Sequence, residues 1–146
     1  MDHRDMRDIM DHLSDEIMVF DAHYRMVYVN EACRRHYGLP PEALIGKTFD
    51  ELDGTFWGNS TLPEVYATKK REAPRQITNQ GCDIITISVP LLDANGDIRY
   101  VTQNVNDLQE VNRVSEAEKR PVQITAEKGR TPYPGINRKM NQLLLT

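Results

Sequence analysis

The pattern of hydrophobic and polar residues predicts two groups of β-strands separated by a stretch of short helices. Apolar, β-branched and aromatic residues fill 16–20 and 25–29 on either side of the turn-like segment 21–24, which is typical of a hairpin. Farther along, the segment 93–96 (DANG) predicts a tight turn between two longer strands. The five predicted strands span 16–20, 25–29, 75–79, 83–92 and 98–106.

Helical spacing of apolar residues marks the segments around these strands. An amphipathic helix is predicted over residues 2–13, because four apolar side chains recur on one face and charged ones on the other. The four are Met6, Ile9, Met10 and Leu13. Residues 61–72 also have helical spacing, with Thr61 as N-cap, and we expect 48–60 to be irregular.

Capping residues predict two further short helices. Asn30 follows the second predicted strand and is suited to cap a helix over about 31–37, because its side-chain oxygen accepts a hydrogen bond from an unpaired backbone N–H. That helix is expected to stop at Gly38. Pro41 opens another helical turn, since proline is tolerated at the first helical position.

The order of elements predicts an α+β fold with one five-stranded antiparallel sheet. Short helices are inserted between strands 2 and 3, an amphipathic helix precedes the sheet, and an exit helix follows it. A stretch rich in proline and glycine near the C-terminus is typical of a linker. We divide the chain into 1–14 (N-terminal helix), 15–108 (main domain), 109–120 (exit helix), 121–135 (linker) and 136–146 (start of a following domain).

Composition narrows the classes of protein to which the chain can belong. Its 146 residues suit one domain with a hydrophobic core. The net charge of −4 argues against a surface that binds nucleic acid. No apolar run reaches the length of a membrane span, and the N-terminus lacks the order of a secretory signal. Cys33 and Cys82 form no CxxC pair, and a cytoplasmic location is expected.

Two stretches together resemble the halves of a PAS domain. The first is VFDAHYRMVYVNEACRRHYGLPPEALIGKTFDEL, and the second is ITISVPLLDANGDIRYVTQNVNDL. The features that carry the resemblance, in chain order, are Asp21, Asn30, Tyr37-Gly38, Leu44-Ile45-Gly46-Lys47, Pro90, Asn95-Gly96 and Asp107-Leu108. The match covers roughly residues 9–114. It departs from the family after Asp107, where Leu-Gln replaces Ile-Thr, and the resemblance implies a sensory domain that is not an enzyme.

The resemblance and the hydrophobic alternation disagree about which face of strand 83–92 points inward. In PAS domains the inner face of the sheet encloses a pocket, and alignment on Pro90 selects the inner set Ile84, Thr86 and Ser88, opposite Gln103 and Val105. Alternation alone favours burial of the more apolar set, Ile85, Ile87 and Val89. We expect both faces to be covered, the outer one by the N-terminal helix or by a second subunit.

The cofactors that PAS domains hold find little support in this sequence. Phe49 occupies the place of the reactive cysteine in flavin photosensors, and no histidine occurs in 61–72, where a haem ligand would lie. Burial tendencies favour core roles for Cys33 and His36, and no second histidine or cysteine stands at metal spacing. We therefore predict no flavin, haem or metal, and no catalytic motif is present.

A small organic ligand in the pocket remains one interpretation, and a filled core without ligand is the other. The candidate pocket residues are Met18, Phe20, Cys33, His36, Phe49, Thr86, Ser88 and Gln103. Asn30, Gly46, Pro90, Gly96 and Asp107 are expected to have structural or signalling roles.

The C-terminal segment suggests what the domain regulates. The segment PGINRKMNQLLLT resembles the junction at which the AAA+ ATPase begins in sigma-54-dependent transcriptional activators. This resemblance implies a regulatory domain that acts on a downstream ATPase. A sensor histidine kinase input domain and a ligand-free dimerisation module are the alternatives. A homodimer is expected because exposed apolar patches mark contacts, and its candidate contacts are Met6, Ile9, Met10, Leu13, Ile85, Ile87 and Val89.

Overall fold

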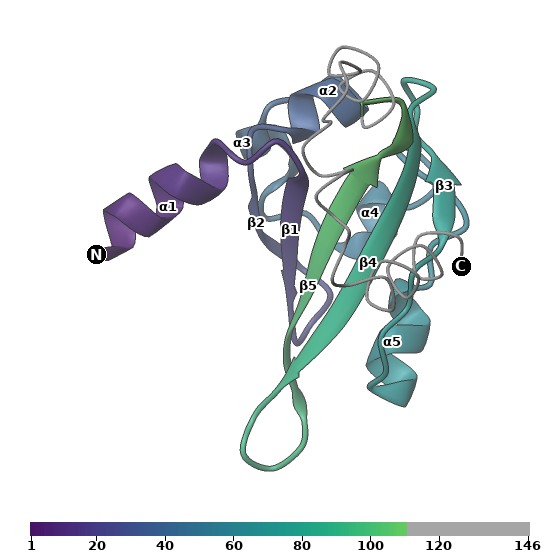
Figure 1. Cartoon of the computed structure of the whole chain (residues 1–146). Helices are drawn as coiled ribbons and strands as arrows, with labels where there is room; N and C mark the ends of the chain where they lie inside the picture. The colour runs from purple at the N-terminus through teal and green to yellow at the C-terminus, as the bar shows by residue number, and fades with distance from the viewer. Residues whose placement is uncertain (111–146) are drawn as a thin grey trace, which may run out of the picture. The chain divides into compact units, whose positions relative to one another are not determined.

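A five-stranded antiparallel sheet forms the centre of the described domain, in the order β2-β1-β5-β4-β3 (Figure 1). The computed structural model describes residues 1–110. The strands are β1 (Glu16–Asp21), β2 (Met26–Val29), β3 (Arg75–Ile77), β4 (Asp83–Leu92) and β5 (Ile98–Asp107). The predicted α+β fold with one antiparallel sheet is therefore confirmed.

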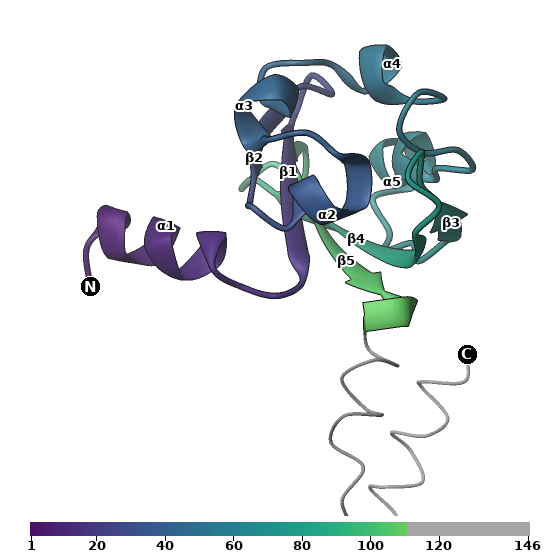
Figure 2. The same ribbon diagram turned by 90° about the horizontal axis from the view of Figure 1, so that it is seen from above.

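Four short helices lie between β2 and β3 in the chain and cover one face of the sheet (Figure 2). They are α2 (Cys33–Tyr37), α3 (Pro41–Leu44), α4 (Phe49–Leu52) and α5 (Leu62–Thr68). A fifth helix, α1 (His3–Asp11), precedes the sheet and extends away from it. Among the described residues, no helix is long and apolar enough to cross a membrane.

Two segments between β2 and β3 differ from their predictions, one expected to be irregular and one expected to be a longer helix. Residues 48–60 are not wholly irregular, because a capping box between Thr48 and Glu51 starts α4. The helix predicted over 61–72 ends at Thr68, since Lys69 adopts a left-handed conformation with φ of 60°. Thr61 precedes that helix without capping it through its side chain.

Asn30 has a different role from the predicted helix cap. Helix α2 begins after Ala32 without a side-chain cap, whereas the amide of Asn30 is fully buried beside β1. Its Oδ1 accepts a hydrogen bond from the Ile17 amide at 3.0 Å. Its Nδ2 donates to the carbonyls of Met10 (2.8 Å) and Asp15 (3.0 Å). The prediction that Asn30 caps a helix was wrong because the side chain instead satisfies backbone groups of the α1–β1 connection.

The inner face of the sheet packs against the short helices and forms the core. Strand β4 turns Ile84, Thr86 and Ser88 inward, and all three are buried, while the alternate residues from 85 to 89 are partly exposed. The β4–β5 register places Ser88 opposite Gln103. The fully buried apolar side chains include Met18, Phe20, Met26, Leu44, Leu52, Leu62 and Val65. Each contributes roughly 1.5–3 kcal/mol of transfer free energy, so the core is apolar at its centre and polar along β4.

The chain leaves the sheet through the start of a helix. Residues 108–110 are helical, and the Asp107 carboxylate caps them by accepting hydrogen bonds from the amides of Gln109 (2.9 Å) and Glu110 (3.0 Å). The remainder of the predicted exit helix, the linker 121–135 and the segment 136–146 lie outside the described residues.

Candidate functional site: a polar cavity and a buried ionisable cluster

A small cavity lies between the inner face of the sheet and the helices. Its volume is about 10 Å³, which is the room that a single ordered water needs. Residues from β1, β3, β4, β5, α2 and the segment before α5 surround it. The lining residues are Met18, Tyr37, Trp57, Ser60, Gln76, Thr86, Gln103 and Val105.

Neutral hydrogen-bonding side chains define the polar side of this cavity. The Thr86 hydroxyl donates to Gln76 Oε1 at 2.7 Å, and Gln76 Nε2 donates to the Gly58 carbonyl at 2.8 Å. Gln103 Nε2 donates to the Ser88 hydroxyl at 2.9 Å. The alternation of β4 brings its polar residues to this face, and the ladder with β5 brings Gln103 beside them. The cavity can therefore exchange hydrogen bonds with a neutral polar group.

The predicted pocket residues divide into cavity-lining and core positions. Met18, Thr86 and Gln103 line the cavity, and Ser88 is bonded to Gln103. Phe20 and Phe49 are instead core residues, with their rings edge to face at 6.5 Å. Cys33 and His36 are buried but do not line the cavity.

Several lining residues were not predicted from the sequence. Gln76 is the informative case, because it is buried between two exposed residues of the short strand β3. A strand of three residues is too short for alternation to indicate its buried position from the sequence. Trp57 and Ser60 lie in the connection between α4 and α5, whose path the hydrophobic pattern does not indicate.

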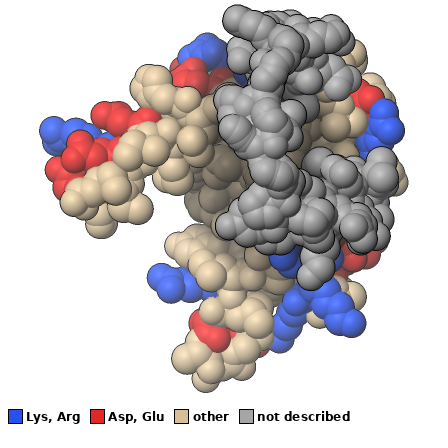
Figure 3. Space-filling view, viewed as in Figure 1, with Lys and Arg blue, Asp and Glu red and all other residues tan. Residues whose placement is uncertain are grey.

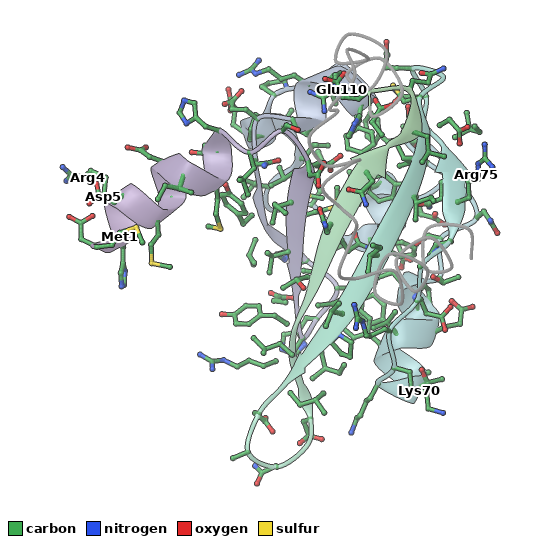
Figure 4. The ribbon with its side chains drawn as sticks, in the orientation of Figure 1. Met1, Arg4, Asp5, Lys70, Arg75 and Glu110 are labelled. Atoms are coloured by element: carbon green, nitrogen blue, oxygen red, sulfur yellow. The ribbon has the colours of Figure 1, made fainter. Side chains whose placement is uncertain are left out.

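A surface hollow adjoins the cavity through one shared residue. The hollow is lined by Gly58, Asn59, Arg75, Gln76 and Ile77, and its volume is about 450 Å³. Gln76 lines both spaces. Its side chain, tied to Thr86 and Gly58, therefore separates the cavity from the hollow. Arg75, labelled in Figure 4, lies on the outer side of β3.

A cluster of buried ionisable groups lies near the ends of β1 and β5. His36 Nδ1 is 2.6 Å from Glu16 Oε1, and both side chains are fully buried. On the other side of the ring, His36 Nε2 is 3.4 Å from Asp107 Oδ2. Burial raises the pKa of Glu16 above its ordinary value of 4.5, and the contacts with His36 oppose that rise. Sequence reasoning missed Glu16, since a carboxylate at the first position of a strand gives no signal of burial.

Cys33 has neither the ionisation nor the exposure of a reactive thiol. Burial raises its pKa to about 12, and its Sγ donates to the Leu39 carbonyl at 3.3 Å. A protonated thiol is neither a nucleophile nor a metal ligand. Among residues 1–110, no cluster of three His, Cys, Asp or Glu residues is placed to hold a metal ion.

The residues around the cavity do not fit haem or flavin. The lining residues include no histidine to ligate a haem iron and no cysteine to react with a flavin, and helix α5 (sequence LPEVYAT) contains no histidine.

Helix α1 presents an apolar stripe that the rest of the described chain leaves exposed. Ile9 is 52% exposed and Met6 48%, while Leu13, just beyond the helix, is also exposed. Figure 3 shows charged side chains along α1 beside a surface of uncharged residues. Arg4 and Asp5 project from the helix into solvent (Figure 4). The Tyr28 hydroxyl anchors the end of the helix by donating to Asp11 Oδ1 at 2.6 Å.

The model of the family described as PAS fold matches residues 10–113 of this chain. A comparison with curated protein sequences gives no match. Among solved structures, the chain is similar to the PAS domain of a Colwellia psychrerythraea protein (18% identity, 73% of this chain and 97% of that one, TM-score 0.56). It is also similar to a PAS domain from a two-component sensor histidine kinase (14% identity, 71% of this chain and 94% of that one, TM-score 0.53). A third similar structure is VqmA bound to DPO (19% identity, 73% of this chain and 58% of that one, TM-score 0.51).

Proposed function

This chain belongs to the PAS family, and from that premise we propose that it is a sensory domain that takes a small, uncharged polar ligand in the cavity between sheet and helices. The observation that carries the proposal is the buried set of neutral hydrogen-bonding side chains around that space. A core without ligand function would bury apolar side chains at these inward β4 positions.

The chemistry of the lining favours an uncharged ligand. The polar lining groups are amides and hydroxyls, and none of the residues around the cavity carries a full charge. A buried ionic ligand would need a counter-charge, because a charge transferred from water without a partner is costly. Amides and hydroxyls recognise neutral donors and acceptors at much lower cost. VqmA, one of the similar structures, is bound to DPO, which supports a ligand-binding role for this chain.

Ligand entry is proposed to occur past Gln76. The cavity must expand to hold an organic molecule, and the hollow outside β3 provides about 450 Å³ of adjoining space. Rotation of the Gln76 side chain breaks two hydrogen bonds. Those bonds have a net value of roughly 1 kcal/mol each, so ligand contacts can replace them. The Gln76→Ala variant is expected to bind the same ligand with a faster association rate.

A fragment titration tests the ligand class. The full chain is titrated with two matched libraries of fragments under ten heavy atoms, one of neutral amides and alcohols and one of carboxylates. Binding is followed by amide NMR shifts of β4 and β5 and by fluorescence of Trp57, the single tryptophan. We expect shifts from neutral fragments that Gln103→Met abolishes and the exposed control Gln109→Met retains. Preferential carboxylate binding, or equal response in Gln103→Met, contradicts the proposal.

We further propose that the domain acts in the cytoplasm on a sigma-54-interacting AAA+ ATPase and so regulates transcription. The support is the resemblance of residues 135–146 to the start of that ATPase. The similarity to a histidine kinase PAS domain supports a kinase as the alternative output. The coding sequence downstream discriminates them: a phosphate-binding glycine loop supports the ATPase, and a phosphoacceptor histidine helix contradicts it.

A second copy of this chain is the proposed partner of the α1 stripe. The support is that Met6, Ile9 and Leu13 are exposed together, as apolar contact patches are. The partly exposed residues Ile85, Ile87 and Val89 on the outer face of β4 extend the candidate interface. A ligand-free dimerisation module predicts the same stripe without fragment binding, so the titration above separates the two functions.

A further inference from the structure

The number of protons held by the Glu16–His36 pair determines whether His36 Nε2 faces Asp107 with an N–H or with a lone pair. If the pair holds one shared proton, two arrangements exist: carboxylate with imidazolium, or carboxylic acid with neutral imidazole. In both, Nδ1 and Oε1 share a hydrogen bond at 2.6 Å, and Nε2 carries a proton. That N–H faces Asp107 Oδ2 at 3.4 Å, an electrostatic contact that is not a hydrogen bond. This conclusion does not depend on which partner holds the proton.

Removal of that proton leaves the cluster one donor short. A neutral imidazole has a single N–H, which can face Glu16 or Asp107 but not both. Because Nδ1 lies closer to its carboxylate than Nε2 does, the proton stays on Nδ1. A nitrogen lone pair then faces Asp107 Oδ2, and the contact becomes repulsive. The side chains are buried, so water compensates poorly for the loss.

Asp107 connects the protonation state of the Glu16–His36 pair to the helix that begins at residue 108. One of its oxygens, Oδ1, accepts hydrogen bonds from the amides of Gln109 and Glu110, while Oδ2 faces His36. Any rotation of the carboxylate away from His36 therefore changes the geometry of the cap. The carboxylate lies on the last residue of β5, and the capped residues follow it directly.

We propose that Glu16, His36 and Asp107 form a protonation-dependent latch, in which the shared proton holds Asp107 against α2 and its loss loosens the cap of the exit helix. The latch is a property of the described fold and does not depend on whether the cavity binds a ligand. Its output is the same segment through which the proposed sensory function would act, so a proton and a ligand can bias one structural element.

Other ionisable groups near Glu16, His36 and Asp107 contribute to the electrostatic potential at the latch. From α2, Arg35 Nε lies 3.9 Å from Asp107 Oδ2 at the edge of the cluster, and its Nη2 donates to the Ser14 carbonyl. Tyr37 is buried beside Glu16, and burial raises its pKa far above its ordinary value, so it remains neutral. Cys33 and Cys82 are free thiols nearby. Arg35 is the one permanent cation among these groups, and it offsets one of the two carboxylates.

Amide exchange in the full chain tests the latch against a matched internal control. Asp93 caps the amides of Asn95 (2.8 Å) and Asp97 (3.0 Å) through one carboxylate oxygen, and no histidine within residues 1–110 is hydrogen-bonded to it. Solvent-exchange NMR from pH 5 to 9 measures how strongly the amide protons of Gln109 and Glu110 are protected from exchange. The amide protons of Asn95 and Asp97 are the reference. The ring nitrogen shifts of His36 report its tautomer over the same range. We expect the ratio of the protection of Gln109 and Glu110 to that of Asn95 and Asp97 to fall about fivefold, the typical value of a cap, as the Glu16–His36 pair loses its shared proton.

Two variants separate the latch from ordinary titration. In Glu16→Gln the amide donates to Nδ1 without titrating, so Nε2–H is fixed toward Asp107 and the ratio is expected to be independent of pH. His36→Gln removes the imidazole and is expected to abolish the transition too. A ratio that stays constant in the wild type overturns the proposal. A transition that persists in either variant also overturns it.

Discussion

Replacement of Asn30 by alanine is expected to be among the most destabilising polar substitutions in this domain. The buried amide makes three hydrogen bonds, to the Ile17 amide and to the carbonyls of Met10 and Asp15. Each is worth roughly 1 kcal/mol net, and an unsatisfied buried group costs more. Asn30 itself is fully buried, but its three partner residues are only partly buried, so water replaces some of the lost bonds. We expect the free energy of unfolding to fall by about 2–3 kcal/mol, and Tm by roughly 10–15 °C.

Urea denaturation followed by Trp57 fluorescence measures this loss, and Asn106→Ala is the matched control. Asn106 lies on the same sheet, is partly exposed, and makes no side-chain hydrogen bond with a described residue. Asn30→Asp tests the direction of the hydrogen bonds. Its carboxylate can still accept from the Ile17 amide, but it has no donor for the carbonyls of Met10 and Asp15 and repels them. That variant is expected to be as unstable as Asn30→Ala at pH 7 and to recover in acid. A loss below about 0.5 kcal/mol for Asn30→Ala, which is the usual surface value, refutes the reasoning.

Three further predictions follow from burial, backbone conformation and exposure. Burial raises the pKa of Glu16 above 4.5, so the folded chain retains a proton that the unfolded chain releases. The free energy of unfolding, measured by urea denaturation, should therefore fall as pH rises above 4.5. In Glu16→Gln this fall should be smaller. Gly38→Ala and Gly96→Ala should each lower the free energy of unfolding, by urea denaturation, by roughly 1 kcal/mol. Both glycines have φ near 80°, and the Gln80 Nε2 that a Cβ at Gly38 would meet at 3.0 Å belongs to an exposed side chain that can move. Ile9→Ser should shift sedimentation from dimer to monomer, and an unchanged profile would exclude α1 from the interface.

The sheet could be predicted from the sequence because its signals are local. Alternation and turn composition within each segment located all five strands, and the turn at 93–96 formed as expected, with Gly96 at φ of 83°. The capping box that begins α4 was also present as Thr48 and Glu51 three residues apart. It could have been found by the same rules.

The roles of buried polar groups could not be predicted, because they depend on residues far apart in the chain. Asn30 has the local signature of a helix cap, and only the return of the chain beside α1 shows that it bridges backbone groups. Glu16 and His36 are twenty residues apart, and no periodicity relates them. Gln76 belongs to a strand of three residues, which is too short for alternation to identify its buried face.

Native mass spectrometry of the freshly purified full chain tests the central claim most directly. A sensory domain with a cavity for a small neutral molecule should retain such a molecule at stoichiometric amounts, and Gln103→Met should lose it while Gln109→Met keeps it. The mass difference identifies the molecule, and its charge class checks the chemistry of the lining. A clean protein mass for the wild type, together with no response to neutral fragments in the titration, would contradict the account.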